Sequence, residues 1–160
     1  MAMTTNIEPR VSDFYCADPG VFGGTRLDGR VSPSLITNID RRRLSRLVEL
    51  GRCVDETAAA LLRRKMKKSH VVAAATMPPT VVTMNSRVLC RNLETEHERE
   101  LTLVYPCNCA AERGHVSVLS RAGIDLLAAS PGDSLPRFEL GTWHIVELLY
   151  QPEAEGHYHL

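Results

Sequence analysis

Few side chains in this chain combine a type and a spacing that could support catalysis or metal binding. Asp55 and Glu56 are adjacent. Neighbours on a helix point about 100° apart, so these carboxylates do not converge on one cation. Cys107 and Cys109 precede His115, but a single intervening residue is unusual for structural zinc, and no second pair supplies the remaining ligands. We therefore expect no metal, no cofactor and no catalytic residue.

The glycine-rich and serine-centred motifs of common enzyme classes do not occur in the sequence. Gly20, Gly23 and Gly24 match neither the P-loop nor the dinucleotide-binding spacing, and there is no Gly-x-Ser-x-Gly elbow. Asp55 is better explained as the N-cap of a helix, where its carboxylate accepts backbone N–H bonds. The residues thus favour a binding protein over an enzyme.

Charge is distributed unevenly along a chain whose formal net charge is zero. Residues 40–68 carry ten Lys or Arg and four acids, a net +6, whereas residues 77–160 carry six Arg and eleven acids, a net −5. A basic block beside an acidic one indicates two units with different surfaces. The basic unit suits an acidic or polyanionic partner, although a solvated helical face is the simpler alternative.

Two short amphipathic helices are predicted within the basic block. Asn38 can cap a helix beginning near Asp40, Gly51 can end it, and Asp55 can cap a second helix. The apolar stripes comprise Leu44, Leu47 and Val48 in the first helix and Ala58, Leu61, Leu62 and Met66 in the second. Helices this short are not stable alone, so the stripes must pair with each other or with the rest of the protein. We expect an antiparallel helical hairpin, a short coiled coil.

Two sets of hairpin residues are candidates for partner contacts. The predicted tip consists of Arg52, Asp55 and Glu56. The predicted basic face consists of Arg41, Arg42, Arg43, Arg46, Arg63, Arg64 and Lys65.

The residue pattern changes from helical to β-rich after the predicted hairpin, at Met77. Pro78 and Pro79 end any helix, and short β-rich runs follow. We expect strands over 81–84, 88–93, 101–105, 116–119, 135–140 and 143–150, with one short helix over 122–129. The predicted class is α+β, with a mostly antiparallel sheet. The chain then divides into an irregular arm (1–34), the basic hairpin (35–76), a C-terminal domain (77–156) and a tail (157–160).

Nothing in the sequence indicates a membrane or secreted protein. No stretch approaches the ~18–20 apolar residues of a membrane span. The first thirty residues lack a signal-peptide pattern, and the five cysteines are too sparse for a disulfide framework. We expect a cytoplasmic protein.

Several segments resemble a known bacterial family. They are MPPTVVTMNS (77–86), LTLVYP (101–106), VSVLS (116–120), Gly123, Leu126 and Leu127, Gly132 and Asp133, and ELLYQP (147–152). Together these segments are similar to the regulators of nucleoside diphosphate kinase, which are relatives of the Gre transcript-cleavage factors. The resemblance covers about residues 35–156.

The resemblance implies an FKBP-like C-terminal domain behind a short coiled-coil hairpin. In Gre relatives this domain docks at the rim of the RNA polymerase secondary channel, and paired acids at the coiled-coil tip help hold the magnesium used in RNA cleavage. Those acids are three residues apart, whereas here Ala58 and Ala59 follow Asp55 and Glu56 at that spacing. Arms of about 12 residues also reach only ~18 Å. The family comparison thus implies a non-enzymatic regulator that binds polymerase and competes with Gre-type factors.

The docking loop of the family corresponds to Leu119, Ser120 and Arg121. Relatives usually carry proline where Arg121 stands, so this loop departs from their pattern. Two alternatives remain open: regulation of nucleoside diphosphate kinase level or activity, and a nucleic-acid-binding module that uses the basic hairpin. Prolyl isomerisation, which other FKBP-like proteins catalyse, is disfavoured because the chain has only eight aromatic residues to line such a pocket.

Overall fold

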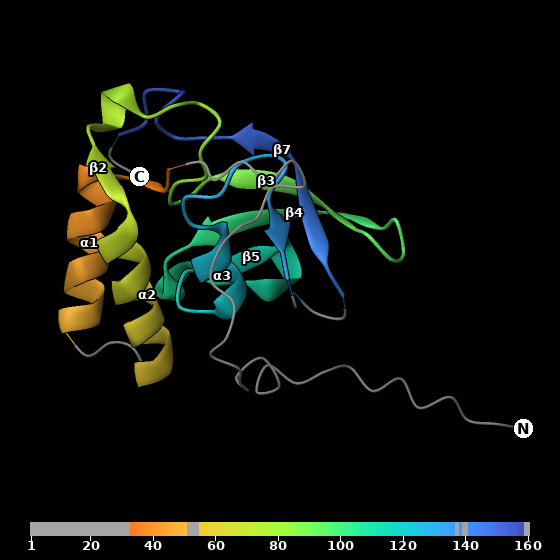
Figure 1. The fold of residues 1–160 in the computed structure, drawn as a ribbon, viewed down its shortest axis with the longest axis horizontal. Coiled ribbons are helices and arrows are strands. Elements are labelled where there is room, and N and C mark those ends of the chain that lie inside the picture. Colours follow the sequence, from red (N-terminus) through yellow and green to blue (C-terminus); the bar gives the residue numbers. More distant parts are fainter. Residues whose placement is uncertain (1–32, 51–54, 137, 139–140, 159–160) are drawn as a thin grey trace, which may run out of the picture.

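The structure is a computed structural model that describes residues 33–50, 55–136, 138 and 141–158. The α+β class is confirmed: a pair of helices lies beside a curled five-stranded sheet that carries one short helix (Figure 1). The helices are α1 (Asn38–Glu49), α2 (Glu56–Lys68) and α3 (Arg121–Leu126), with 3-10 turns η2 (Ala74–Thr76), η3 (Pro106–Asn108) and η4 (Ala111–Arg113). The strands are β1 (Leu35–Thr37), β2 (His70–Val72), β3 (Arg87–Asn92), β4 (Glu98–Val104), β5 (His115–Ser117), β6 (Ser134–Leu135) and β7 (Trp143–Tyr150).

Helices α1 and α2 run antiparallel side by side (Figure 1). The prediction that Asn38 caps α1 is wrong by one residue: the Thr37 hydroxyl oxygen accepts the Asp40 N–H at 2.9 Å, and Asn38 is the first helical residue. The predicted cap of α2 is confirmed, because Asp55 Oδ1 accepts the Thr57 N–H at 2.8 Å. Gly51, the predicted end of the first helix, lies outside the described residues.

A two-stranded parallel sheet that the sequence did not predict joins the open end of the helix pair. Strand β1 leads directly into α1, and strand β2 follows α2. The two strands lie side by side, with Leu35 paired with His70. Ser34 and Ser69, just before these strands, add a hydroxyl–hydroxyl hydrogen bond of 2.7 Å. The two ends of the helix pair are therefore fixed to each other.

The main sheet has the strand order β5-β4-β3-β7-β6. The sheet is mostly antiparallel, as predicted, and the exception is one edge, where β5 pairs parallel to β4. A parallel return needs a longer connection than a hairpin turn, and η3 and η4 provide it between the two strands.

One of the predicted strands, over residues 81–84, is a loop. Residues 81–84 form no strand because their polar groups bond to other partners: Val82 N–H donates to the Ala129 carbonyl, and Thr83 N–H donates to Ser86 Oγ. The side-chain amide of Gln151 donates to the Val81 carbonyl at 2.7 Å. Of the strand expected over 135–140, Leu135 pairs with β7 as part of β6, and residues 137, 139 and 140 lie outside the described residues.

The helix pair and the sheet share one hydrophobic core. Leu44 and Leu62, from the two predicted stripes, belong to the same buried cluster as Leu103, Ile124 and Ile145 of the domain. Both stripes thus face the domain as well as each other, which fixes the helix pair against it. Within the described residues no helix has the length and hydrophobicity to cross a membrane.

Candidate functional site

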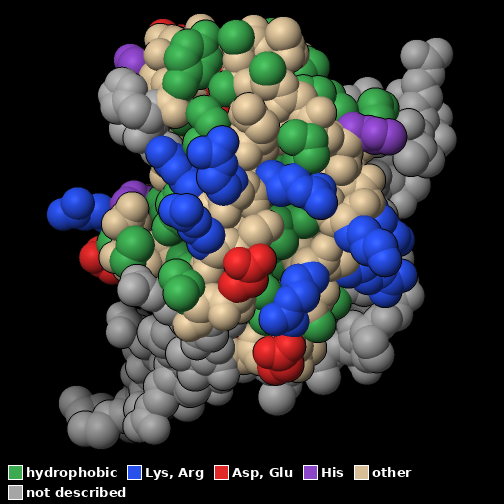
Figure 2. Space-filling model, turned by 90° about the vertical axis from the view of Figure 1, so that its left-hand side faces the viewer, with side chains coloured by type: hydrophobic (Ala, Val, Ile, Leu, Met, Phe, Trp, Pro, Cys, Tyr) green, Lys and Arg blue, Asp and Glu red, His purple; other side chains and the backbone are tan. Residues whose placement is uncertain are grey.

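Basic side chains cover the outer face of the helix pair. Figure 2 looks at the side where α1 and α2 lie in Figure 1 and shows Lys and Arg gathered there, with few acids between them. The exposed members, which we call the outer basic face, are Arg42, Arg46, Arg63, Arg64, Lys67 and Lys68. Arg63 pairs with Glu56 at 2.6 Å, but both side chains are exposed, so the pair adds little stability.

Three of the basic residues singled out in the sequence lie elsewhere. Arg41 is half-buried and donates from Nη1 to the Met66 carbonyl at 2.8 Å, which satisfies the C-terminal end of α2. Arg43 lies beside Tyr105 and Asp40. Burial lowers the pKa of Lys65, while Asp125 and Asp133 oppose that shift. Arg41 thus joins the two helices, while Arg43 and Lys65 lie at the junction between the helix pair and the domain.

The predicted tip offers no pair of free carboxylates among the residues that the structure describes. Asp55 is used as the cap of α2, and Glu56 binds Arg63. The positions three residues further on, Ala58 and Ala59, are 7% and 1% exposed. Arg52 lies outside the described residues.

The predicted docking loop sits between β5 and α3, and each of its residues has a structural contact. Leu119 is half-buried against the core. Ser120 caps α3: its hydroxyl accepts the Gly123 N–H at 3.0 Å and donates to the Ser117 carbonyl at 2.7 Å. Arg121 Nε donates to Asp125 Oδ2 at 3.2 Å. The loop is therefore held in a defined shape at the surface.

Gly123 explains why the start of α3 can lie so close to β5. A Cβ at this position would lie 1.9 Å from the Ser117 carbonyl oxygen and 2.9 Å from the Val118 Cα. Both are backbone atoms and cannot turn aside. Gly123 belongs to the segments that resemble the family, but its steric role cannot be seen in the sequence alone.

We expect Gly123→Ala to lower the free energy of unfolding by about 3 kcal/mol, because overpacking against backbone forces the helix away from the strand. Urea unfolding followed by circular dichroism measures this loss. Gly132→Ala is the matched control: its Cβ would meet nothing within 4 Å, although its φ of +96° is strained for alanine, so it should lose only about 1 kcal/mol. Equal losses would contradict the steric role.

A buried aspartate at the junction was not identified as a functional group from the sequence. Asp40 is 4% exposed. Its Oδ2 accepts the Met84 N–H at 3.3 Å, and its Oδ1 accepts the Tyr105 hydroxyl at 3.4 Å. Burial, reinforced by the nearby Glu153, raises its pKa from 3.8 to about 6. The signal in the sequence was a single acid, Asp40, in the first turn of a helix that is otherwise rich in arginine.

The described residues contain no cluster of three or more Cys, His, Asp or Glu side chains able to hold a metal ion. His115 Nδ1 lies 2.8 Å from the Asn108 carbonyl, and the Cys109 thiol contacts the His115 carbonyl at 3.8 Å.

Cys90 is buried in β3, where desolvation raises its pKa to about 12. The thiol of Cys90 therefore stays protonated and is a poor nucleophile.

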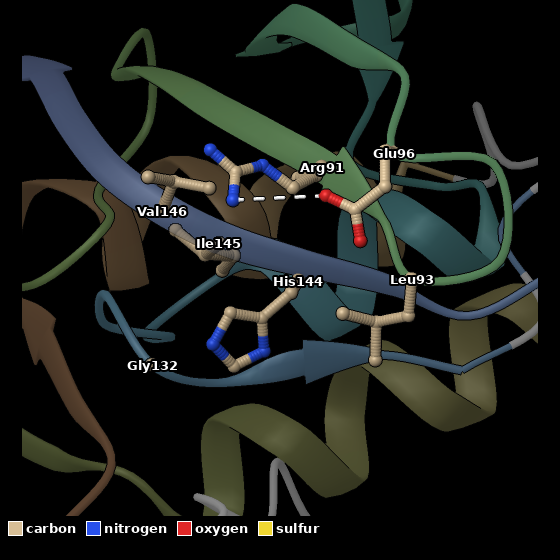
Figure 3. A pocket seen from close by; sticks show the side chains of 7 residues that line it. All are labelled: Arg91, Leu93, Glu96, Gly132, His144, Ile145 and Val146. Carbon is tan, nitrogen blue, oxygen red and sulfur yellow. Dashed lines mark ion pairs between the residues drawn. The ribbon is translucent and has the colours of Figure 1, made fainter.

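Among the described residues, one depression of the surface lies on the outer face of the sheet. It measures about 370 Å³, and its lining includes Arg91, Glu96, His144 and the apolar side chains of Leu93 and Val146. In Figure 3 the Arg91–Glu96 ion pair, 3.9 Å long, lies on one side of β7 and His144 on the other. Arg91 also binds Glu98 at 2.6 Å, so its charge is neutralised within the chain. These groups do not converge on a common point where a substrate could react.

A second depression, which we call the α1 groove, lies between the end of α1 and the end of β4. It measures about 400 Å³. Its lining comprises Arg43, Arg46, Leu47 and Leu50 on one side and Tyr105, Pro106 and Cys107 on the other. The α1 groove thus brings basic and apolar side chains together.

Comparison with known proteins identifies relatives over most of the chain. The family model for the C-terminal part of transcription elongation factor GreA/GreB matches residues 77–137. The regulators of nucleoside diphosphate kinase from Escherichia coli (strain K12) and Shigella flexneri are each 36% identical over 131 residues, covering 79% of this chain and 96% of the relative. A solved GreA/GreB elongation factor from Nitrosomonas europaea superposes with a TM-score of 0.64 at 32% identity, covering 72% of this chain and 98% of that chain.

Proposed function

This chain belongs to the family of the regulator of nucleoside diphosphate kinase, and we propose that it acts as a non-enzymatic transcription regulator. In this proposal the chain binds RNA polymerase near the secondary channel through its GreA/GreB-type domain. Its short helical hairpin then occupies the entrance that Gre-type elongation factors use. The effect is to exclude those factors and so tune elongation. We also propose that the domain is FKBP-like and that the hairpin is a short coiled coil.

The observation that carries the proposal is the combination of a Gre-type domain with a short, firmly packed helix pair. Residues 77–137 match the GreA/GreB model, and 72% of the chain superposes on a solved GreA/GreB factor. Helices of 12 and 13 residues extend only about 18–20 Å at 1.5 Å per residue. A hairpin of that length supports occupancy of an entrance better than delivery of chemistry to a distant metal.

The chemistry of the tip supports a competitor over a cleavage factor. Cleavage by metal catalysis needs carboxylates that converge on the ion, as Mg²⁺ prefers oxygen ligands in near-octahedral geometry. Here the carboxylates of Asp55 and Glu56 are already bonded within the chain. The residues at the spacing used in the family are buried alanines.

A transcript-cleavage assay on stalled elongation complexes tests this proposal. We expect the protein alone to leave the cleavage rate at its intrinsic level. Added to reactions that contain a Gre cleavage factor, it should reduce the stimulated rate in proportion to its concentration. Stimulation of cleavage by this chain alone would contradict the argument from the missing acid pair.

A second candidate function follows from the name of the relatives, which is regulation of nucleoside diphosphate kinase. No contact in the structure identifies a kinase-binding surface among the described residues. Purified kinase assayed with and without this chain separates a direct effect on activity from an effect on expression. A direct change in kinase activity that does not need polymerase would favour this second function.

A third candidate, binding of nucleic acid, is supported by the outer basic face. Phosphate contacts by Lys and Arg make such binding steeply salt-dependent. Arg42→Glu combined with Lys68→Glu reverses two exposed charges without touching the junction. Salt-sensitive binding to free RNA or DNA that this variant loses would favour the third function over the first.

A further inference from the structure

The α1 groove combines an apolar floor with a positive rim. Leu50 is 66% exposed, the highest value among the large hydrophobic side chains that the structure describes. Leu47, one turn before it on α1, is half-buried at the edge of the core. Pro106 and the half-buried ring of Tyr105 form the opposite wall. Exposed apolar side chains that line a hollow commonly mark a binding surface.

The charge of the groove selects the kind of ligand that fits it. Arg43 and Arg46 line the groove together with Leu47 and Leu50, and Arg43 lies one helical turn from Leu47 along α1. No Asp or Glu is among the described residues that line the groove. Arg46 is exposed and sits in the last turn of α1. Arg43 already interacts with Tyr105 and Asp40, whereas the guanidinium of Arg46 is exposed at the rim, where it favours a carboxylate of the ligand.

We propose that the α1 groove binds an acidic peptide segment of a partner protein, with a leucine-like or phenylalanine-like side chain in the floor and a flanking carboxylate on Arg46. The volume of about 400 Å³ lies at the small end of the range for ligand pockets, which suits one or two side chains. None of the residues that line this groove belongs to the loop at residues 119–121 or to α2.

A peptide fits the groove better than a nucleic acid does. Single-stranded nucleic acids stack their bases on exposed aromatic faces. The aromatic residue of this groove, Tyr105, is half-buried and donates its hydroxyl inward to Asp40. The exposed floor is aliphatic, and aliphatic side chains give bases no such platform.

Fluorescence anisotropy with the full chain and a short labelled peptide, in which leucine and phenylalanine alternate with aspartate, tests the proposal. We expect saturable binding, with amide chemical shifts in the ¹⁵N spectrum changing at Leu47, Leu50 and Cys107. Leu50→Glu and Arg46→Glu should each weaken binding at least tenfold. The same peptide with lysine in place of aspartate, or with alanine in place of the apolar residues, should not bind.

Arg87→Glu is the matched control, since it makes the same charge change as Arg46→Glu at an exposed site on β3, on the outer face of the sheet. Its affinity for the peptide should stay within twofold of the wild type. Equal weakening by Arg87→Glu would show general attraction of charge and overturn the proposal. Two other outcomes would also overturn it: tighter binding of a single-stranded oligonucleotide to the same amides, or a dimer in analytical ultracentrifugation that Leu50→Glu dissociates.

Discussion

Replacing Asp40 by asparagine should remove a loss of stability that the wild-type chain suffers as the pH rises from about 4 to about 6. The carboxyl of Asp40 is buried between α1, the segment around Met84 and Tyr105, and its pKa is raised from 3.8 to about 6. Desolvation, the largest cause, disfavours the charged form. Glu153 adds repulsion, while the bond from Met84 N–H and the charge of Arg43 offset part of the effect.

The sign follows from linkage. A folded-state pKa above the unfolded value means that the folded protein binds the proton more tightly than the unfolded protein. The stabilising contribution is complete below pH 3.8 and is lost as the pH passes through about 6. At about 1.4 kcal/mol per pKa unit, the loss amounts to about 3 kcal/mol. The asparagine of the variant cannot ionise, so the free energy of unfolding of wild type relative to Asp40→Asn should fall by that amount.

Chemical denaturation of both proteins at a series of pH values measures this difference directly, because titration of the other acids cancels between them. Glu56→Gln is the matched control, since Glu56 is exposed and its loss should leave the pH dependence unchanged. A constant difference between wild type and Asp40→Asn from pH 4 to pH 7 would show that Asp40 is solvated and that the helix pair is less firmly packed than described.

Loss of the charge of Arg121 should weaken binding to RNA polymerase by about tenfold, a typical effect for a charged residue at an interface. Arg121 lies in the docking loop that the family resemblance implies, and its side chain is 33% exposed. The same guanidinium pairs with Asp125. Arg121→Gln therefore removes both a docking charge and an internal ion pair, and a second variant must separate the two effects.

Asp125→Asn supplies that separation. It breaks the same ion pair but leaves the charge of Arg121 at the surface. Burial already raises the pKa of Asp125, so a neutral group is tolerated there. We expect surface plasmon resonance with immobilised core polymerase to show weaker binding for Arg121→Gln and near-normal binding for Asp125→Asn. Equal weakening by both variants would assign Arg121 a purely structural role.

The sequence was sufficient to predict the elements with strong local signals. The apolar stripes of α1 and α2, the cap at Asp55 and the alternating strands β3, β4 and β7 depend on periodicity and hydrogen-bonding groups close in sequence. The family resemblance was also confirmed by relatives at 36% identity. Local hydrophobic patterns and sequence motifs can be recognised in a single sequence without knowledge of its fold.

What the sequence could not show depends on contacts between distant segments. Strands β1 and β2 have three residues each, which is too short for a recognisable alternation of side chains. The two helices also separate them in the sequence. The parallel edge at β5 depends on the path of the preceding turns. Residues 81–84 look like a strand because they are mostly apolar. Their backbone groups, however, form hydrogen bonds with Gln151 and Ala129.

For the candidate site too, local patterns predicted one part, and contacts between distant segments determine the rest. The basic block was evident from composition, but the structure assigns Arg41 and Lys65 to internal contacts and leaves others exposed. The burial of Asp40 needs the domain to cover the start of α1, which no helical pattern reveals. The α1 groove likewise exists only where the end of α1 meets the end of β4.

Direct binding to core RNA polymerase, with and without a competing Gre factor, is the measurement that tests the central claim. The purified chain should bind polymerase, and increasing amounts of the Gre factor should displace it, because both would occupy the rim of the secondary channel. Binding that the Gre factor does not displace, or no binding at micromolar concentrations, would contradict the account and favour the kinase or nucleic-acid functions.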